Sequence, residues 1–109
     1  MGIQELVDAA YATAMEKGWH DRERNIGESI ALMHSELSEV LEAARDRRPL
    51  TEVYRTGDSP KPEGVPVELA DLVIRVFDFC GEHKIDLEHA IEEKMAYNRT
   101  RPHRHGKAF

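Results

Sequence analysis

Two stretches of the sequence decide which fold to expect: His34-Ser35-Glu36-Leu37-Ser38-Glu39-Val40-Leu41 and Val67-Glu68-Leu69-Ala70-Asp71-Leu72-Val73. In each stretch, two acidic residues lie three positions apart among apolar residues. Residues at this spacing lie on one face of a helix, one turn apart, and apolar residues recur around them at helical intervals. Both stretches therefore predict helices that carry a pair of carboxylates along the edge of an apolar stripe.

Outward from these stretches, the spacing of apolar residues predicts four helices, over residues 3–17, 25–47, 67–82 and 86–100. Gly18 is a suitable stop for the first helix, Asn25 or a neighbour can cap the second, and Asp86 can cap the fourth. Residues 48–66 contain most of the prolines and predict a loop. We expect one all-α domain over residues 1–109, a four-helix bundle-like protomer in which the second and third helices pair antiparallel, with a basic tail at 102–109.

The composition narrows the classes of partner. The chain has 109 residues, of which 40% are hydrophobic and 33% charged, and its net charge is -6. An acidic balance argues against binding a nucleic-acid polymer, and no apolar run approaches the ~20 residues that span a membrane. Cys80 is the only cysteine, and the first residues do not resemble a signal peptide. We expect a cytoplasmic protein whose small core is helped by oligomerisation, for example through Ile3, Leu6 and Val7.

The carboxylate pairs indicate a metal site. On a wheel of about 100° per residue, both pairs are offset in the same sense from their apolar stripes, so packing of the stripes brings the acids together. Four adjacent carboxylates either take up protons or hold a cation, and oxygen ligands favour Mg²⁺, Mn²⁺ or Ca²⁺. A di-iron site is disfavoured because the sequence has no Glu-x-x-His. The alternative is a solvated helix surface, with Arg75 as a salt-bridge partner four residues after Asp71.

At these residues the sequence resembles the MazG-like, all-α nucleoside triphosphate pyrophosphohydrolases, over roughly residues 18–109. The matching segments are Glu36-x-x-Glu39, Lys61-Pro62-Glu63-Gly64, Glu68-x-x-Asp71 and Lys94-x-x-x-Asn98-x-x-Arg101-Pro102-x-x-His105-Gly106-Lys107. The resemblance implies an all-α NTP pyrophosphatase fold and hydrolysis of a (d)NTP to the (d)NMP and pyrophosphate, in clearance of the nucleotide pool. It implies Mg²⁺, with Mn²⁺ as the alternative, and a homodimer or dimer of dimers with active sites near bundles shared by subunits.

Each candidate residue then receives a role. Glu36, Glu39, Glu68 and Asp71 are the expected metal ligands, and Glu36 or Glu39 is the expected general base. Lys94, Asn98 and Arg101 share one stripe of the fourth helix and are expected to bind the triphosphate, with His105 and Lys107 closing over it. Trp19 is expected either to stack on the base or to lie in the core or in an interface. The stripe also has a plainer interpretation, as the solvated basic end of a helix.

Two other functions stay open at this stage. One is a non-enzymatic helical module that binds a nucleotide or a partner protein. The other is hydrolysis of a different metal-bound pyrophosphate, such as a phosphoribosyl-ATP intermediate.

Overall fold

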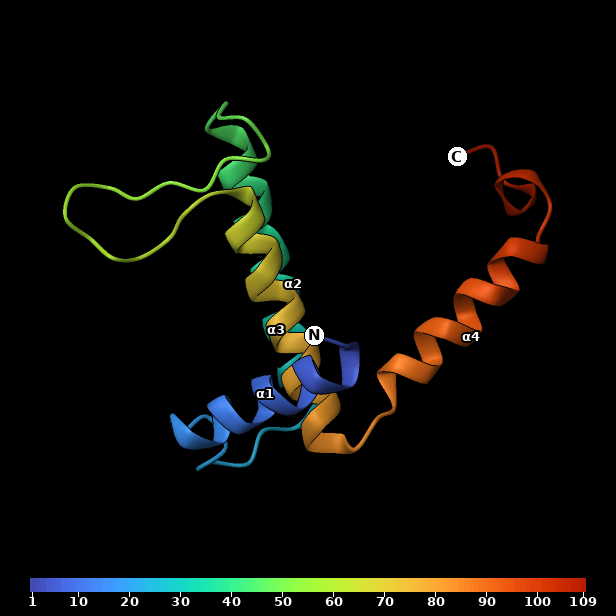
Figure 1. Cartoon of the computed structure of the whole chain (residues 1–109), viewed down its shortest axis with the longest axis horizontal. Helices are drawn as coiled ribbons and strands as arrows, with labels where there is room; N and C mark the ends of the chain where they lie inside the picture. The colour runs from blue at the N-terminus through green and yellow to red at the C-terminus, as the bar shows by residue number, and fades with distance from the viewer.

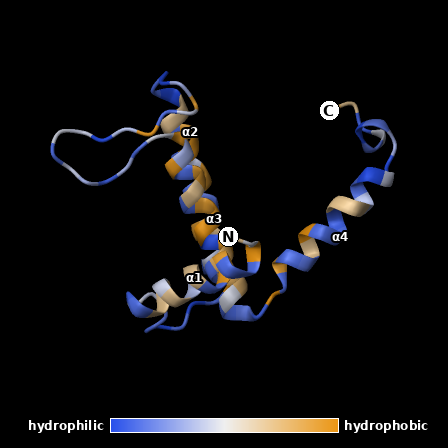
Figure 2. Cartoon of the chain, viewed as in Figure 1, coloured by the Kyte–Doolittle hydropathy of each residue, from blue (hydrophilic) through white to orange (hydrophobic).

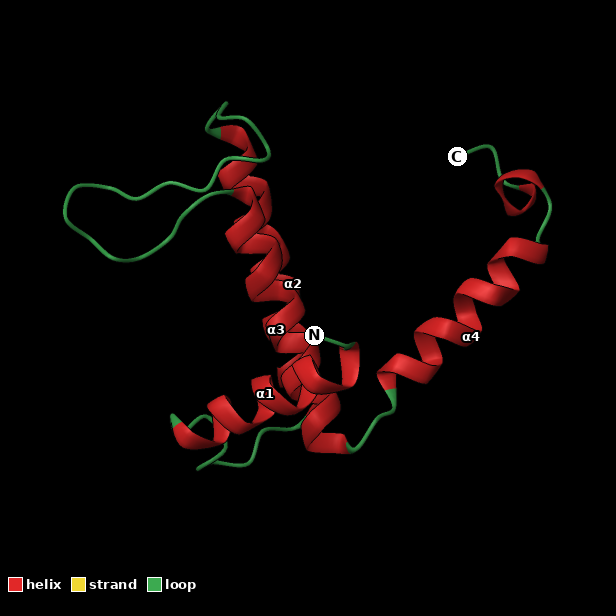
Figure 3. Cartoon of the chain, viewed as in Figure 1, coloured by secondary structure: helices red, strands yellow, loops and turns green.

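Four α-helices and one short 3-10 helix make up the chain, in a computed structural model that describes all 109 residues. The helices are α1 (Ile3–Glu16), α2 (Ile26–Arg45), α3 (Val65–His83) and α4 (Leu87–Thr100), and the 3-10 helix η1 covers His103–Gly106. The only β-type pairing is an isolated bridge between Tyr54 and Glu63. The prediction of an all-α fold is therefore confirmed (Figure 3).

The helix ends follow local signals in the sequence. The Asn25 and Asp86 side chains cap α2 and α4, each accepting a hydrogen bond from the amide three residues later, at 2.7 and 3.1 Å. Gly18 lies just past the end of α1 with a φ of +84°, a conformation that glycine adopts without strain. Helix α3 begins at Val65, two residues earlier than expected, because Pro66 is tolerated in a first turn, where its missing N–H loses no helical bond.

Helices α2 and α3 lie side by side and antiparallel, and α1 packs across the end of the pair that lies away from the connecting segment (Figure 1). The connecting segment, residues 46–64, projects from the other end of the pair. Within it, the Arg48 guanidinium lies 3.7 Å from the centre of the Tyr54 ring, and Tyr54 pairs with Glu63. The long connection thus allows α3 to return along α2.

The core is small and joins α1 to the C-terminal half of α3. Its buried apolar residues are Val7, which is 1% exposed, Phe77 and Cys80. Ile3 and Leu6 are partly buried and pack against the same cluster. The expectation that Ile3, Leu6 and Val7 contribute to a subunit interface is therefore wrong for Val7, because α1 folds back onto α3 and buries this side chain within the protomer. For Ile3 and Leu6, which are only partly buried, it stays a prediction. Cys80 lies in the core as expected.

The apolar stripes of α2 and α3 are only half covered. Seven large apolar side chains on the two helices are more than 40% exposed: Ile26, Ile30, Leu37, Leu41, Leu69, Val73 and Ile74. Other apolar residues of the two helices, Met33, Val40, Leu72 and Val76, are partly buried. Figure 2 shows the hydrophobic residues concentrated on this pair of helices. The protomer therefore presents an apolar face, and none of its helices is both long enough and apolar enough to cross a membrane.

Helix α4 is attached to the rest of the protein by its first turn. Leu87 packs against the core, and the Gln4 amide donates a hydrogen bond of 3.3 Å to the Glu88 carboxylate. Beyond this turn α4 leads away from the other three helices and carries the C-terminus with it (Figure 1). The position of α4 decides which predicted site residues can meet within one chain.

Candidate functional site

Three of the four predicted metal ligands converge between α2 and α3. Glu36 on α2, together with Glu68 and Asp71 on α3, places one carboxylate oxygen each within 4.8 Å of the others. The convergence follows from the antiparallel pairing of two helices whose acids lie at corresponding edges of their apolar stripes. Glu36 and Glu68 are partly buried and Asp71 is exposed, so the cluster opens to solvent on one side.

Glu39, the fourth predicted ligand, lies outside this group of three. Its side chain is exposed one turn further along α2, and it forms no salt bridge or side-chain hydrogen bond within the chain. Glu39 is nevertheless close enough for its charge to act on Glu68, whose pKa it helps to raise. The four acids thus form a triad with an additional free carboxylate beside it.

The cluster carries more negative than positive charge, and this excess acts on Glu68. Burial raises the pKa of the Glu68 carboxyl above its ordinary value of 4.5, and repulsion from Asp71, Glu39 and Glu36 raises this pKa further. The positive charge of Lys61 acts in the opposite direction. A carboxyl group under these influences is easier to protonate and gains stability from a nearby cation.

Arg75 forms an ion pair with the cluster, but its partner differs from the one expected. Its Nε donates a hydrogen bond of 2.7 Å to Glu36 Oε1, and so links α3 to α2. The salt bridge between Arg75 and Asp71 along α3, which belonged to the alternative interpretation as solvated surface, is absent. The Arg75 side chain leans across to the neighbouring helix, where Glu36 is only 17% exposed and offers a more desolvated partner.

A cleft of about 500 Å³ opens beside the cluster. Glu36, Asp71 and Arg75 form its charged side. Another part of the lining is apolar. It consists of Leu6, Ala9, Ala10 and Ala14 of α1, together with Trp19 from the segment after α1. Cavities of this size, mostly apolar with a few polar groups, are typical of sites for small molecules.

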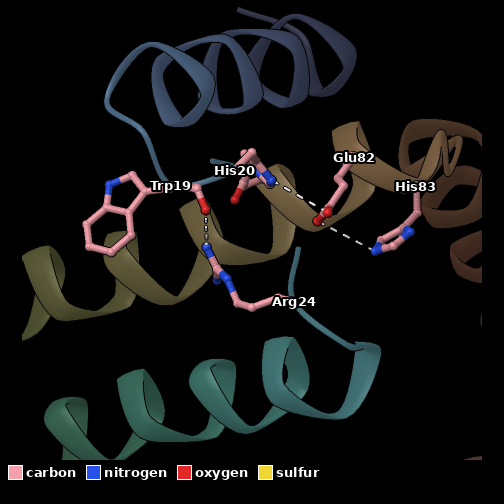
Figure 4. A network of polar contacts seen from close by, with 6 residues as sticks. Trp19, His20, Arg24, Glu82 and His83 are labelled. Atoms are coloured by element: carbon pink, nitrogen blue, oxygen red, sulfur yellow. Dashed lines mark hydrogen bonds and ion pairs between the residues drawn. The ribbon is translucent and has the colours of Figure 1, made fainter. Parts of the chain in front are cut away.

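The segment between α1 and α2 closes one side of the cleft. The Trp19 ring is 62% exposed and lines the cleft, so its burial in the core is excluded. Arg24 donates a hydrogen bond of 2.9 Å to the Trp19 carbonyl oxygen (Figure 4). This contact fixes the backbone beside the ring, while the ring itself stays free to meet a flat ligand.

His20 anchors the same segment to α3. Its Nε2 lies 2.7 Å from Asp78 Oδ1, and its Nδ1 lies 3.5 Å from Glu82 Oε1. Figure 4 shows Glu82 between His20 and His83, whose Nε2 is 3.6 Å from the other Glu82 oxygen. The edge of the His20 ring also meets Tyr11 of α1. These contacts hold Trp19 at a defined distance from the acid cluster.

The predicted substrate-binding residues of α4 do not reach this cleft within one chain. Lys94 and Arg101 both lie over the Tyr97 ring, with their charged groups 5.1 and 5.6 Å from its centre. The Oδ1 atom of Asn98 is buried and accepts no hydrogen bond. None of these residues lines the cleft, because α4 points away from α2 and α3 beyond its first turn.

The last two predicted residues, His105 and Lys107, lie in or just after η1 at the far end of α4, and both are exposed. The structure therefore brings Glu36, Glu68, Asp71 and Trp19 to one place, with Glu39 adjacent. It leaves Lys94, Asn98, Arg101, His105 and Lys107 on a separate arm.

Three charged residues of the cleft were not among the predicted site residues: Arg24, Arg75 and Asp78. Arg75 follows Asp71 by one helical turn, so its position beside the acids was visible, but not its pairing with another helix. Asp78 lies two turns after Asp71 on the same face of α3, which is a detectable signal. Arg24 lies in an irregular segment, where spacing gives no such indication.

The donor set fits a hard divalent cation. Three carboxylates on two rigid helices, without histidine or cysteine among them, offer the oxygen ligands that Mg²⁺ and Mn²⁺ prefer. A cation there would relieve the repulsion that raises the pKa of Glu68. Comparison of the chain with protein-family models, with curated proteins and with solved structures finds no match.

Proposed function

We propose that this protein is a nucleoside triphosphate pyrophosphohydrolase that requires Mg²⁺, or Mn²⁺ in its place, and releases the (d)NMP and pyrophosphate. The observation that carries the proposal is the convergence of Glu36, Glu68 and Asp71 within 4.8 Å, at the edge of a cleft that also exposes Trp19. A carboxylate cluster that can hold a metal suits phosphates, and a mostly apolar cleft with an exposed indole suits a nucleobase. The two features lie together in one cavity.

In this proposal Glu36, Glu68 and Asp71 hold the cation. Bound Mg²⁺ supplies charge neutralisation for the phosphates and lowers the pKa of a water molecule beside them. Hydrolysis between the α- and β-phosphates then needs a base that takes a proton from water in line with the leaving pyrophosphate. Glu39 is the better base of the two predicted, because it is unpaired and exposed, whereas Glu36 is held by Arg75.

The cleft positions the nucleoside. The ring of Trp19 provides a face on which a base can stack, and stacking of this kind contributes about 1–3 kcal/mol. Small side chains at Ala9, Ala10 and Ala14 leave room along α1. The contacts of His20 with α3 hold this wall in place, so the base and the reacting phosphate stay at a fixed separation.

We further propose that the working enzyme is a homodimer, or a dimer of dimers. Leu37 and Leu41 on α2 and Leu69 and Val73 on α3 are exposed apolar side chains, and only three apolar residues are buried in the protomer. A core of that size supports a small domain poorly. Packing of two such faces forms a four-helix bundle and offers α4 of one copy a route to the cleft of the other.

The dimer has a chemical purpose in this proposal. The cleft is acidic, while Lys94 and Arg101 lie on α4, which points away from it in the same chain. A second copy brings these cations to the triphosphate, with His105 and Lys107 following on the tail. Leu41→Glu, a change at a residue 61% exposed, is expected to give a monomer in sedimentation that retains its helical circular dichroism. A wild-type protein that sediments as a monomer contradicts this part.

The test of the activity is a panel of the standard and damaged (d)NTPs incubated with Mg²⁺, with pyrophosphate release as the measurement. Glu39→Gln is expected to lower kcat about 10²–10⁴-fold with the fold intact. The matched control is Glu92→Gln, which removes an exposed, unpaired carboxylate of α4 and is expected to leave kcat unchanged. Absence of pyrophosphate with every nucleotide contradicts the proposed function and favours a non-enzymatic binding module.

A further inference from the structure

The ion pair between Arg75 and Glu36 occupies the position where the proposed function requires both a metal and a phosphate. The Arg75 Nε to Glu36 Oε1 distance is 2.7 Å, and the two side chains are 31% and 17% exposed. Both residues line the 500 Å³ cleft. The pair is thus partly desolvated and faces the cavity, unlike the surface pair of Arg22 and Glu28, in which the arginine is 76% exposed.

Arg75 has unused hydrogen-bonding capacity on the side of the cleft. A guanidinium carries five N–H donors, and Arg75 uses only its Nε, toward Glu36. Its two terminal nitrogens donate to no acceptor in the protein. A planar fork with free donors is the group that best matches two oxygens of a phosphate.

The other basic residues near the cleft are less suited to this role. Arg24 donates a hydrogen bond to the Trp19 carbonyl oxygen, so it lies in the part of the cleft where the proposed function places the nucleobase. Lys61 acts on the charge of Glu68 from the exposed connecting segment but does not line the cleft. Lys94 and Arg101 lie on α4 and reach a cleft only in the proposed dimer. Arg75 is therefore the one cation of the chain in direct contact with the acid cluster.

A cation coordinated by Glu36 competes with Arg75 for the same carboxylate. Without metal, the guanidinium compensates one charge of the cluster. With metal, the guanidinium faces a second positive charge across Glu36, and this repulsion favours its contact with an anion instead. The phosphates of a nucleotide provide that anion at the same end of the cleft.

We propose that Arg75 is a phosphate-binding residue that exchanges its contact with Glu36 for substrate phosphate oxygens when metal and nucleotide enter the cleft. The inference rests on the proposed function, and it adds a residue from the cleft itself to the cations of α4. No bond is made or broken in the exchange: a charge-assisted hydrogen bond to a carboxylate is replaced by one to a phosphate. In this role Arg75 also keeps Glu36 from binding metal tightly until substrate arrives.

The exchange predicts opposite effects of one substitution on two ligands. Arg75→Gln removes the competitor for Glu36, so the affinity for Mn²⁺ alone is expected to rise about threefold to tenfold, the scale of a partly screened charge interaction. The same change removes the phosphate contact, so the affinity for inorganic pyrophosphate in the presence of Mg²⁺ is expected to fall about tenfold or more. If Arg75 only stabilised the packing of α2 on α3, its substitution would not raise the affinity for Mn²⁺ while lowering the affinity for pyrophosphate.

Titration calorimetry on the full chain measures both affinities, with MnCl₂ alone and with pyrophosphate in excess Mg²⁺. Arg75→Lys keeps the charge without the fork, so it is expected to retain wild-type Mn²⁺ affinity and an intermediate pyrophosphate affinity. Arg22→Gln is the matched control, because it removes an arginine that pairs with a glutamate outside the cleft. It is expected to change neither affinity.

The outcomes separate the inference from the function on which it rests. An unchanged pyrophosphate affinity in Arg75→Gln, or equal weakening of both ligands, overturns the role of Arg75 while leaving the enzyme proposal standing. If Arg75→Gln does not fold, Arg75→Lys with wild-type pyrophosphate affinity overturns it equally. A wild-type chain that binds neither Mn²⁺ nor pyrophosphate with Mg²⁺ refutes the proposed function and this inference together.

Discussion

Replacement of Glu68 by glutamine gives opposite changes in stability with and without metal. Glu68 is the partly buried member of the triad whose pKa is raised, first by burial and then by repulsion from Asp71, Glu39 and Glu36. Because its pKa in the folded protein lies above 4.5, the fold favours the protonated form. The penalty for ionised Glu68 is absent well below pH 4.5, grows as pH rises from there, and is complete above the raised pKa.

The size of the penalty follows from its surroundings. One pKa unit corresponds to about 1.4 kcal/mol, but solvent reaches this site, and the first turn of α3 favours a negative charge. A discounted value of about 0.5 kcal/mol is therefore appropriate. In the metal-free protein at pH 7, Glu68→Gln is expected to raise the melting temperature by about 2–4 °C. This gain should shrink as pH falls through the raised pKa of Glu68 and vanish well below pH 4.5, where the wild-type carboxyl is protonated in both the folded and the unfolded protein.

Bound metal makes the wild type more stable than the Glu68→Gln variant. At a free Mn²⁺ concentration ten times the dissociation constant, binding stabilises the wild type by about 1.4 kcal/mol. If loss of one carboxylate ligand weakens binding tenfold, the same concentration stabilises the variant by only about 0.4 kcal/mol. The wild type then exceeds the variant by about 0.5 kcal/mol, so the two melting curves exchange places on addition of metal.

Thermal melts followed by circular dichroism, in EDTA and in MnCl₂, measure which of the two proteins is more stable. A pH series from 4 to 7 in EDTA measures how their difference in stability changes with pH. Glu92→Gln, at an exposed site on α4, controls for the loss of one charge and is expected to show neither effect. Two results refute the reasoning: a variant less stable than wild type in EDTA at pH 7, or an equal stabilisation of both proteins by Mn²⁺.

Two further predictions concern α1 and the cleft. Gly81→Ala is expected to destabilise the protein by about 1–3 kcal/mol in urea titrations, because the added Cβ would lie 2.5 Å from Tyr11 Cβ, where α1 crosses α3. The control Gly27→Ala, whose Cβ would meet only the Asn25 side chain at 3.3 Å, should be nearly neutral. Similar losses of stability at both positions would argue against the close crossing. Trp19→Ala is expected to change the unfolding free energy by less than about 0.5 kcal/mol but to raise KM for a nucleotide about tenfold, with pyrophosphate affinity unchanged; an unchanged KM would exclude stacking.

The helices themselves are determined by the sequence, because the signals that define them are local. Asn25 and Asp86 cap helices as soon as the chain turns helical at these points, and Gly18 and Pro102 stop helices whatever surrounds them. The i, i+3 spacing likewise places Glu36 with Glu39, and Glu68 with Asp71, on one helix face each. The exception is the start of α3, where Pro66 belongs to the first turn rather than to the loop.

Which side chains meet is decided by tertiary structure, and here the predictions were less complete. Helical periodicity gives the direction of a side chain but not the distance to another helix, so it could not show that Glu39 stays outside the group of three. Arg75 pairs with Glu36 rather than Asp71 because the packing of α3 on α2 offers a more desolvated carboxylate. Val7 became core rather than interface because α1 folds back onto α3.

The carboxylate pairs were thus fixed along the chain by their spacing, while their assembly into a site depended on the return of α3 along α2. The basic stripe of Lys94, Asn98 and Arg101 was equally visible in the sequence, yet the fold carries it away from the acids on α4. The physical reason is the same in both cases. Hydrogen bonding within a helix sets the face on which a residue lies, and only packing between helices sets what that face meets.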